Sequence, residues 1–293
     1  MMNMRKIGFY TLLLSFFVLT NCSKNSDDDS SQKVDKTLNL QATGDSANDI
    51  LSNDKYTKLL IEIGYVTGFK PTTESITNFT EFLKEHTFKE DIEIIYKELV
   101  SPEKDSLSLN EIADLETTNR TQYNSGETLA IYIYFSDAPA EDDDEEEGLV
   151  TLGAVYRNTS MIIHEATVRS LSAQSFFITD ADIETATLNH EFGHLFGLVD
   201  LGSPEVNPHE DSDSENHCDV EGCLMRAELQ FGGPSNKGLI ASSSTTNTGT
   251  IESACSLSGK TILSLLSNKN AKGAATVSLD DECILDLQAN GGR

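Results

Sequence analysis

The sequence predicts a mixed domain of the α/β or α+β class, and three observations support this. Short apolar runs typical of strands alternate with amphipathic segments typical of helices between residues 56 and 197. One run, Thr128–Phe135, is apolar at nearly every position, as expected for a strand buried on both faces. The chain is long enough for one sizeable domain with its own core, and it shows no internal repeat.

The first half of the domain alternates strand and helix. Its predicted elements are a strand at 56–66, a helix from Thr72 to about Glu85, a strand at 92–99 and a helix from Ser108 to about Gln122. Thr72 is placed to cap the first helix, because it directly precedes an apolar stripe with helical spacing. That stripe consists of Ile76, Phe79, Phe82 and Leu83. In the second helix, Ile112 and Leu115 are expected to face inwards.

After the buried strand Thr128–Phe135, two more strands are expected at 150–156 and 160–167, joined at Arg157 and Asn158. The acidic run 141–147 before them is expected to be a solvated loop. Asp180 or Asp182 can start a long helix that ends at Gly197. The Gly- and Ser-rich stretch 232–249 predicts an irregular connection, and two short helices are expected at 260–267 and 278–288.

The long helix carries the most informative motif of the chain, HEFGHLFGLVD at 190–200. Helix positions four apart share a face, so His190 and His194 can bind one metal ion. Glu191 follows the first ligand and can reach a water bound to that metal. Gly197 allows a sharp turn that can bring Asp200 to the same ion. Two imidazoles, one oxygen ligand and one open position suit a catalytic zinc.

The residues around the motif strengthen this interpretation. They are apolar, which places the helix in the core: Leu188, Phe192, Leu195, Phe196 and Leu198. Burying two imidazoles and a carboxylate there is costly unless something pairs with them, and a metal does so.

The string H-E-x-x-H-x-x-G-x-x-D resembles the motif of the metzincin clan of zinc metallopeptidases, in which a Met-turn lies beneath the metal. Snapalysin-like members use Asp as the third ligand, and Asp200 matches them. The segment His217-Cys218-x4-Cys223-Leu224-Met225 instead resembles archaemetzincins, whose corresponding His is the third ligand. Asp200 and His217 therefore compete for this role, with His209 as a further candidate, and Met225 is the candidate for the Met-turn.

The resemblance covers residues 54–232 and implies a metzincin-like fold. A mixed twisted sheet with two helices would form the upper subdomain (54–197), and a small, irregular and helical lower subdomain (198–293) would close an active-site cleft. The segment Thr151–Tyr156 would be the antiparallel edge strand that pairs with an extended substrate. Archaemetzincins hold a second zinc with a later C-x-x-C. This chain has none, so one catalytic zinc ion is expected.

Disulfides are expected among the cysteines if the protein is exported, and metal ligation is the alternative. Besides Cys22, the chain has Cys218, Cys223, Cys255 and Cys283, and four cysteines in an exported protein suggest disulfides. Cys218 and Cys223 can close a small loop, leaving Cys255 with Cys283, but all three pairings remain open.

The N-terminus is typical of a lipoprotein signal peptide, residues 1–21. Arg5 and Lys6 precede the apolar stretch Ile7–Leu19, which is too short to span a bilayer, and Cys22 follows a lipobox-like segment. The alternative is a plain signal peptide. Residues 22–53 are expected to form a flexible acidic tether. Acidic residues after the lipidated Cys22 resemble the surface-export signal of Bacteroidetes lipoproteins, which implies a lipid anchor in the outer membrane, at the cell surface.

The net charge limits the classes of binding partner that the sequence predicts. The formal net charge is −27, and removal of residues 1–21 makes it about −29. Nucleic acid is therefore excluded as a partner, and a protein or peptide substrate is expected. The acidic insert 201–216 makes calcium an additional candidate ligand.

Together these features predict a zinc-dependent endopeptidase. Glu191 would act as general base toward a zinc-activated water that attacks the peptide bond. Two alternatives remain: a non-enzymatic surface lipoprotein that binds protein or glycan on a metzincin-like scaffold, and a structural zinc site. Neither has a use for Glu191 beside an open metal position.

Overall fold

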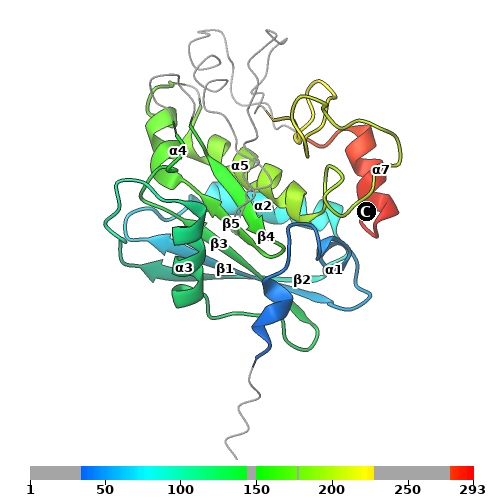
Figure 1. Cartoon of the computed structure of the whole chain (residues 1–293), viewed down its shortest axis with the longest axis horizontal. Coiled ribbons are helices and arrows are strands. Elements are labelled where there is room, and N and C mark those ends of the chain that lie inside the picture. The colour runs from blue at the N-terminus through cyan, green and yellow to red at the C-terminus, as the bar shows by residue number, and fades with distance from the viewer. Residues whose placement is uncertain (1–33, 144–149, 177, 228–277) are drawn as a thin grey trace, which may run out of the picture. The chain divides into compact units, whose positions relative to one another are not determined.

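The computed structural model describes residues 34–143, 150–176, 178–227 and 278–293, and its centre is a five-stranded sheet with strand order β2-β1-β3-β5-β4 (Figure 1). The strands are β1 (Lys58–Val66), β2 (Asp91–Leu99), β3 (Thr128–Phe135), β4 (Gly153–Arg157) and β5 (Ser160–Ile163). All neighbours are parallel except β4, which runs antiparallel to β5 at the edge. β3 lies in the middle and is buried along almost its whole length, as its continuous apolar sequence predicts. The predicted mixed α/β class is confirmed.

Helices cover both faces of this sheet (Figure 1). On one face, the strands pack into a large apolar cluster with residues of α2 (Thr73–His86), α4 (Glu165–Ser172) and α5 (Asp180–Leu195). On the other face, α3 (Leu109–Asn119) contributes Ile112 and Ala113 to a second cluster. Alternate residues of β3 enter the two clusters, since successive side chains of a strand point to opposite faces.

α5 is the most deeply placed of the described helices, because it packs against α2, α4 and the strands β4 and β5. Thr179 caps its start, with a reciprocal hydrogen bond from its backbone N–H to the Asp182 side chain. Its end is set by Gly197, whose φ of 83° is the left-handed conformation that terminates helices. A side chain at Gly197 would also lie 2.5 Å from the backbone nitrogen of Ser203. The predicted sharp turn after the HEFGH motif is therefore present.

One expected strand is partly a helix. The strand expected at 160–167 ends at Ile163, and α4 begins at Glu165. The strand gives way to the helix at His164. The side chain of this residue is buried, and its Nδ1 donates to the carbonyl oxygen of Ala138 at 2.9 Å. Arg169 then pairs with Glu165 one turn earlier, at 2.6 Å, and stabilises the helix. The preceding strand also starts later than predicted, at Gly153.

The segment before residue 54 is more ordered than expected. The predicted tether 22–53 contains a 3-10 helix η1 (Lys36–Asn39) and the short helix α1 (Ala47–Leu51). Ile50 and Leu51 are fully buried in the main core, and the amide of Asn39 donates to Asn124 and to the backbone carbonyl of Ala130. From Val34 onwards this polar-looking segment is part of the domain, because its few apolar residues are buried.

The C-terminal part holds α7 (Asp281–Ala289), close to the helix expected at 278–288. Cys283 and Leu287 are buried, which fixes α7 to the domain. The expected helix at 260–267 and the irregular stretch at 232–249 lie outside the described residues. None of the helices in the described ranges has the length and apolar character that a membrane span requires.

Candidate functional site

Two histidines of α5 meet at its buried end. His190 and His194 are both fully buried, and their Nε2 atoms lie 3.3 Å apart. The pair shares one helix face because the residues are four positions apart, as the sequence predicts.

A third histidine joins them from the irregular segment after α5. The ring of His217 lies 5.5 Å from that of His190 and 5.2 Å from that of His194, measured between centroids. One nitrogen of each ring lies within 4.8 Å of the others. His217 is held there by its backbone: its carbonyl accepts from Asp211 N at 2.7 Å, and its N–H donates to Ser214 at 3.2 Å.

The three histidines share one tautomer. Each Nδ1 lies within 2.9 Å of a backbone carbonyl oxygen: Leu224 for His190, Leu198 for His194 and Glu215 for His217. A carbonyl only accepts hydrogen bonds, so each Nδ1 carries the proton and each Nε2 carries a lone pair. Burial also lowers the pKa of His190 to about 3 and that of His194 well below its usual range, so these imidazoles are neutral.

The donor set fits zinc. Two nitrogen ligands at zinc-binding distance, in tetrahedral geometry, are separated by about 3.3–3.4 Å. The 3.3 Å between the Nε2 atoms of His190 and His194 matches this separation. Two facing lone pairs in a buried position repel each other, and a cation between them removes that cost. The three imidazoles can therefore hold one zinc ion.

Glu191 lies beside this group. It is fully buried, and both of its carboxylate oxygens lack a hydrogen bond of normal geometry within the described part of the chain. Burial raises the pKa of Glu191 well above its usual range, and the nearby backbone of Val155 in β4 opposes this in part. A buried carboxyl group with unused oxygens is costly in a purely structural role, and a shifted pKa at such a position is typical of groups that exchange protons in functional sites.

Met225 packs against α5 directly under the histidines. Its side chain is fully buried, and a Cβ at Gly193 would lie 2.2 Å from its Sδ atom. A side chain at position 193 would force Met225 to move. The structure therefore places Met225 against the helix turn between His190 and His194, and the Met-turn role stays a prediction.

The other two candidate third ligands lie elsewhere. Asp200 is exposed, with a left-handed φ of 57°, and it does not belong to the histidine group. His209 is buried near α7, with its Nε2 atom 3.5 Å from Cys283 Sγ and 3.6 Å from Asp286. Of the alternatives left open by the sequence, the geometry favours His217.

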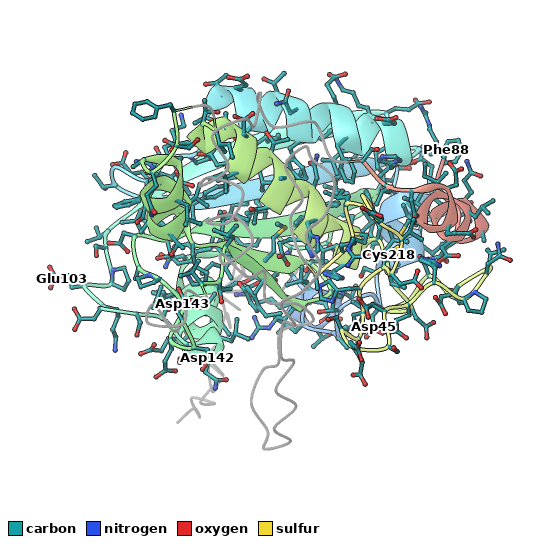
Figure 2. The ribbon with its side chains drawn as sticks, turned by 90° about the horizontal axis from the view of Figure 1, so that it is seen from above. Asp45, Phe88, Glu103, Asp142, Asp143 and Cys218 are labelled. Atoms are coloured by element: carbon teal, nitrogen blue, oxygen red, sulfur yellow. The ribbon has the colours of Figure 1, made fainter. Side chains whose placement is uncertain are left out.

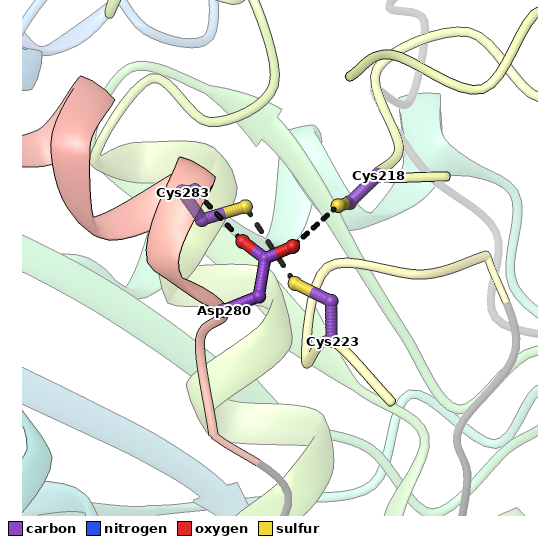
Figure 3. A group of neighbouring side chains, drawn as sticks. All are labelled: Cys218, Cys223, Asp280 and Cys283. Atoms are coloured by element: carbon purple, nitrogen blue, oxygen red, sulfur yellow. Dashed lines mark hydrogen bonds between the residues drawn. The ribbon is translucent and has the colours of Figure 1, made fainter. Parts of the chain in front are cut away.

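A second group of donor atoms is formed by three cysteines and one aspartate (Figure 3). It consists of the Sγ atoms of Cys218, Cys223 and Cys283 and a carboxylate oxygen of Asp280, all within 4.8 Å of one another. The Sγ atoms of Cys223 and Cys283 are 3.6 Å apart, and Cys218 Sγ lies 3.3 Å from Asp280 Oδ2. Sulfur and oxygen ligands on one tetrahedral zinc lie about 3.5–3.8 Å apart, so this group also fits a zinc ion.

This group differs from what the cysteine pattern suggested. The three cysteines are free thiols, not a Cys218–Cys223 disulfide, and Cys255 lies outside the described residues. The neighbouring thiols of Cys218 and Cys283 lower the pKa of Cys223 below its usual range. The expectation of a single metal site assumed that a later C-x-x-C is required. Asp280 and Cys283, with the same spacing, provide the two donors instead.

The acidic segments do not form a comparable group. Within the described ranges, the side chains of 201–216 do not bring three donors together for calcium. Asp143 accepts a hydrogen bond from Thr151 N at 2.7 Å and so ties the start of the acidic run to the chain just before β4. Asp142 and Asp143 lie on the side of the view opposite Cys218 and α7 (Figure 2).

Matches to known proteins come from solved structures alone. No family model matches the chain, and no curated protein matches it. Among solved structures, the chain is similar to the crystal structure of archaemetzincin from Methanopyrus kandleri. The match has 13% identity and a TM-score of 0.39, and it covers 81% of this chain and 96% of that chain.

Exchange of the third ligand should separate the candidates. We expect His217→Ala to weaken zinc binding at the histidine group more than about a hundredfold, and Asp200→Ala to change it less than about threefold. Zinc content after dialysis against a chelator measures this, while thiolate-to-cobalt absorption reports the cysteine group separately. Equal zinc retention by both variants would exclude His217 as a ligand.

Proposed function

We propose that the chain is a zinc-dependent endopeptidase. One observation carries this proposal: three buried histidines bring one ring nitrogen each to within 4.8 Å of the others, and the buried carboxyl group of Glu191 follows the first of them on α5. Three protein ligands leave a fourth zinc position open for water or substrate, as in catalytic sites, whereas structural sites are closed by four protein ligands.

Bound zinc would polarise the scissile carbonyl and lower the pKa of a water molecule. Glu191 would accept the proton of the attacking water and transfer it to the departing amine. The histidines would contribute by keeping their orientation, because each ring is fixed through Nδ1 by a backbone carbonyl.

A peptide is the substrate class that the surrounding fold favours. β4 is an edge strand and pairs with β5 alone among the described strands, so one row of its backbone groups has no strand partner there. An extended peptide can add to such an edge by backbone hydrogen bonds. Because β4 also contacts α5, the added peptide would lie close to the histidines and Glu191.

The cysteine group is better suited to a structural ion. Its four protein donors fill a tetrahedral zinc, and three of them are buried. Cys218 follows the ligand His217 directly, and Cys223 precedes Leu224, whose carbonyl orients His190. We propose that zinc held here fixes both segments and attaches α7 to them.

Localisation as an outer-membrane, cell-surface lipoprotein remains part of the proposal. It is supported by the signal-like residues 1–21 and by Cys22, which lie outside the described residues. The first described residue is Val34, and residues 23–33 lie between it and Cys22 in the sequence.

Replacement of the proposed base tests the enzymatic function. We expect Glu191→Ala to lower kcat for a fluorogenic peptide by at least about a thousandfold, because a general base and its proton transfer are lost. Zinc content should be unchanged, since Glu191 is not a ligand. If the wild type binds zinc but cleaves no member of a broad peptide library, the non-enzymatic binder becomes the better explanation.

Replacement of one cysteine tests whether the cysteine group binds a second zinc ion. We expect the wild type to bind two zinc ions and Cys283→Ser to bind one, with loss of thiolate-to-cobalt absorption in the cobalt-substituted protein. The melting temperature of Cys283→Ser should fall, and a chelator should lower it by less than it lowers that of the wild type, because only the ion at the histidine group is left to remove. A single zinc per wild-type chain would contradict the proposed structural ion.

The anchor can be tested in whole cells of a bacterium that processes lipoproteins. The wild type should incorporate radiolabelled palmitate and partition with membranes, and Cys22→Ala should do neither. Cys255→Ala is the matched control, because it removes a cysteine at which no lipidation is expected. Palmitate incorporation that persists in Cys22→Ala would contradict the lipoprotein assignment.

A further inference from the structure

The histidines and Glu191 are held in different ways. His190 and His194 are each fixed by a hydrogen bond from Nδ1 to a carbonyl, at 2.7 Å and 2.9 Å. The carboxylate of Glu191 has no such hydrogen bond among the described residues. Apart from the nearby backbone of Val155, its orientation therefore depends on the packing of its aliphatic stem.

The stem of Glu191 packs against the backbone of β4. A Cβ added to Gly153 would lie 2.9 Å from Cγ of Glu191, 2.8 Å from Cγ2 of Thr187 and 3.1 Å from the carbonyl oxygen of Ile162. Thr187 and Glu191 are four residues apart on α5, so both lie on the face that β4 covers. Contacts shorter than 3.0 Å force at least one of these groups to move.

The backbone conformation does not explain the glycine. Gly153 does not have a positive φ, and it lies in regular register with Ile163 of β5. Alanine could adopt this conformation, so the absent side chain is required by the contact with α5.

We propose that Gly153 is a positioning residue for Glu191: the strand carries no side chain there, and the space is filled by the stem of the proposed base. This inference rests on the proposed peptidase function. It predicts that filling the space displaces the carboxylate while the metal ligands, which have independent anchors, keep their positions.

Gly153→Ala tests this directly. We expect kcat to fall by about tenfold to a hundredfold, with KM within about twofold, because a shift of the base of about 1 Å is enough for such a loss. Zinc affinity at the histidine group should stay within about threefold of the wild type. A crystal structure of the variant should show the Glu191 side chain displaced and the three histidines unmoved.

Two further variants separate positioning from general destabilisation. Gly64→Ala is the matched control: Gly64 is a buried strand glycine, and its Cβ would lie 2.6 Å from the hydroxyl of Tyr132, on the sheet face covered by α3. It should lower the melting temperature but leave kcat unchanged. Thr187→Ser in the Gly153→Ala background removes the nearest clashing methyl group and keeps the hydroxyl. It should restore part of kcat.

The outcomes distinguish this inference from the proposed function. The positioning role is wrong if the wild type cleaves peptides and Gly153→Ala has the same kcat. It is also wrong if kcat of the variant falls only by the fraction of bound zinc that the variant has lost. It is equally wrong if the Gly153→Ala crystal structure shows Glu191 in its wild-type position, whatever the activity. Absence of cleavage by the wild type overturns the peptidase proposal, and the crystal structure still decides the positioning role.

Discussion

The centre of this protein depends on three hydrogen bonds from histidine Nδ1 atoms to backbone carbonyls. They fix the tautomer and the orientation of each ring, and one nitrogen of each ring lies within 4.8 Å of the others. The carbonyls come from three places: the turn after Gly197, the acidic insert and the segment before Met225. The donor geometry therefore exists only when all three segments are folded around the end of α5. A helix with two suitably spaced histidines would not be enough.

α5 makes close contacts on two of its sides, and each contact is possible because a glycine has no side chain there. On one side, Gly193 of the helix leaves room for Met225. On another, Gly153 of β4 leaves room for Thr187 and Glu191. The two glycines have the same physical role, because each removes a Cβ from a tight contact, but one belongs to the helix and the other to its neighbour. The buried histidines and carboxyl group are thus enclosed by main chain as much as by apolar side chains.

Much of this could be predicted from local sequence. The strands β1, β2 and β3 and the helices α2, α3 and α5 follow from apolar periodicity and capping residues, and His190, Glu191 and His194 follow from their spacing. α4 could not be separated from the strand before it, since the change at His164 depends on a tertiary hydrogen bond to Ala138. The order of residues 34–53 depends on Ile50, Leu51 and Asn39 finding distant partners. Asp280 had no signal of its own, because its donor role appears only when α7 is placed beside Cys218 and Cys223.

The cysteine group also has a topological consequence. Two of its donors precede residue 224 and two follow residue 279, so an ion bound there joins distant positions of the chain. Such a junction reduces the number of conformations open to the unfolded chain, and the reduction grows with the length of the enclosed loop. It also means that a single cut between Cys223 and Asp280 would leave both fragments held together through the ion. After such a cut, the ion would act together with the buried side chains of Cys283 and Leu287 to hold α7 on the rest of the domain.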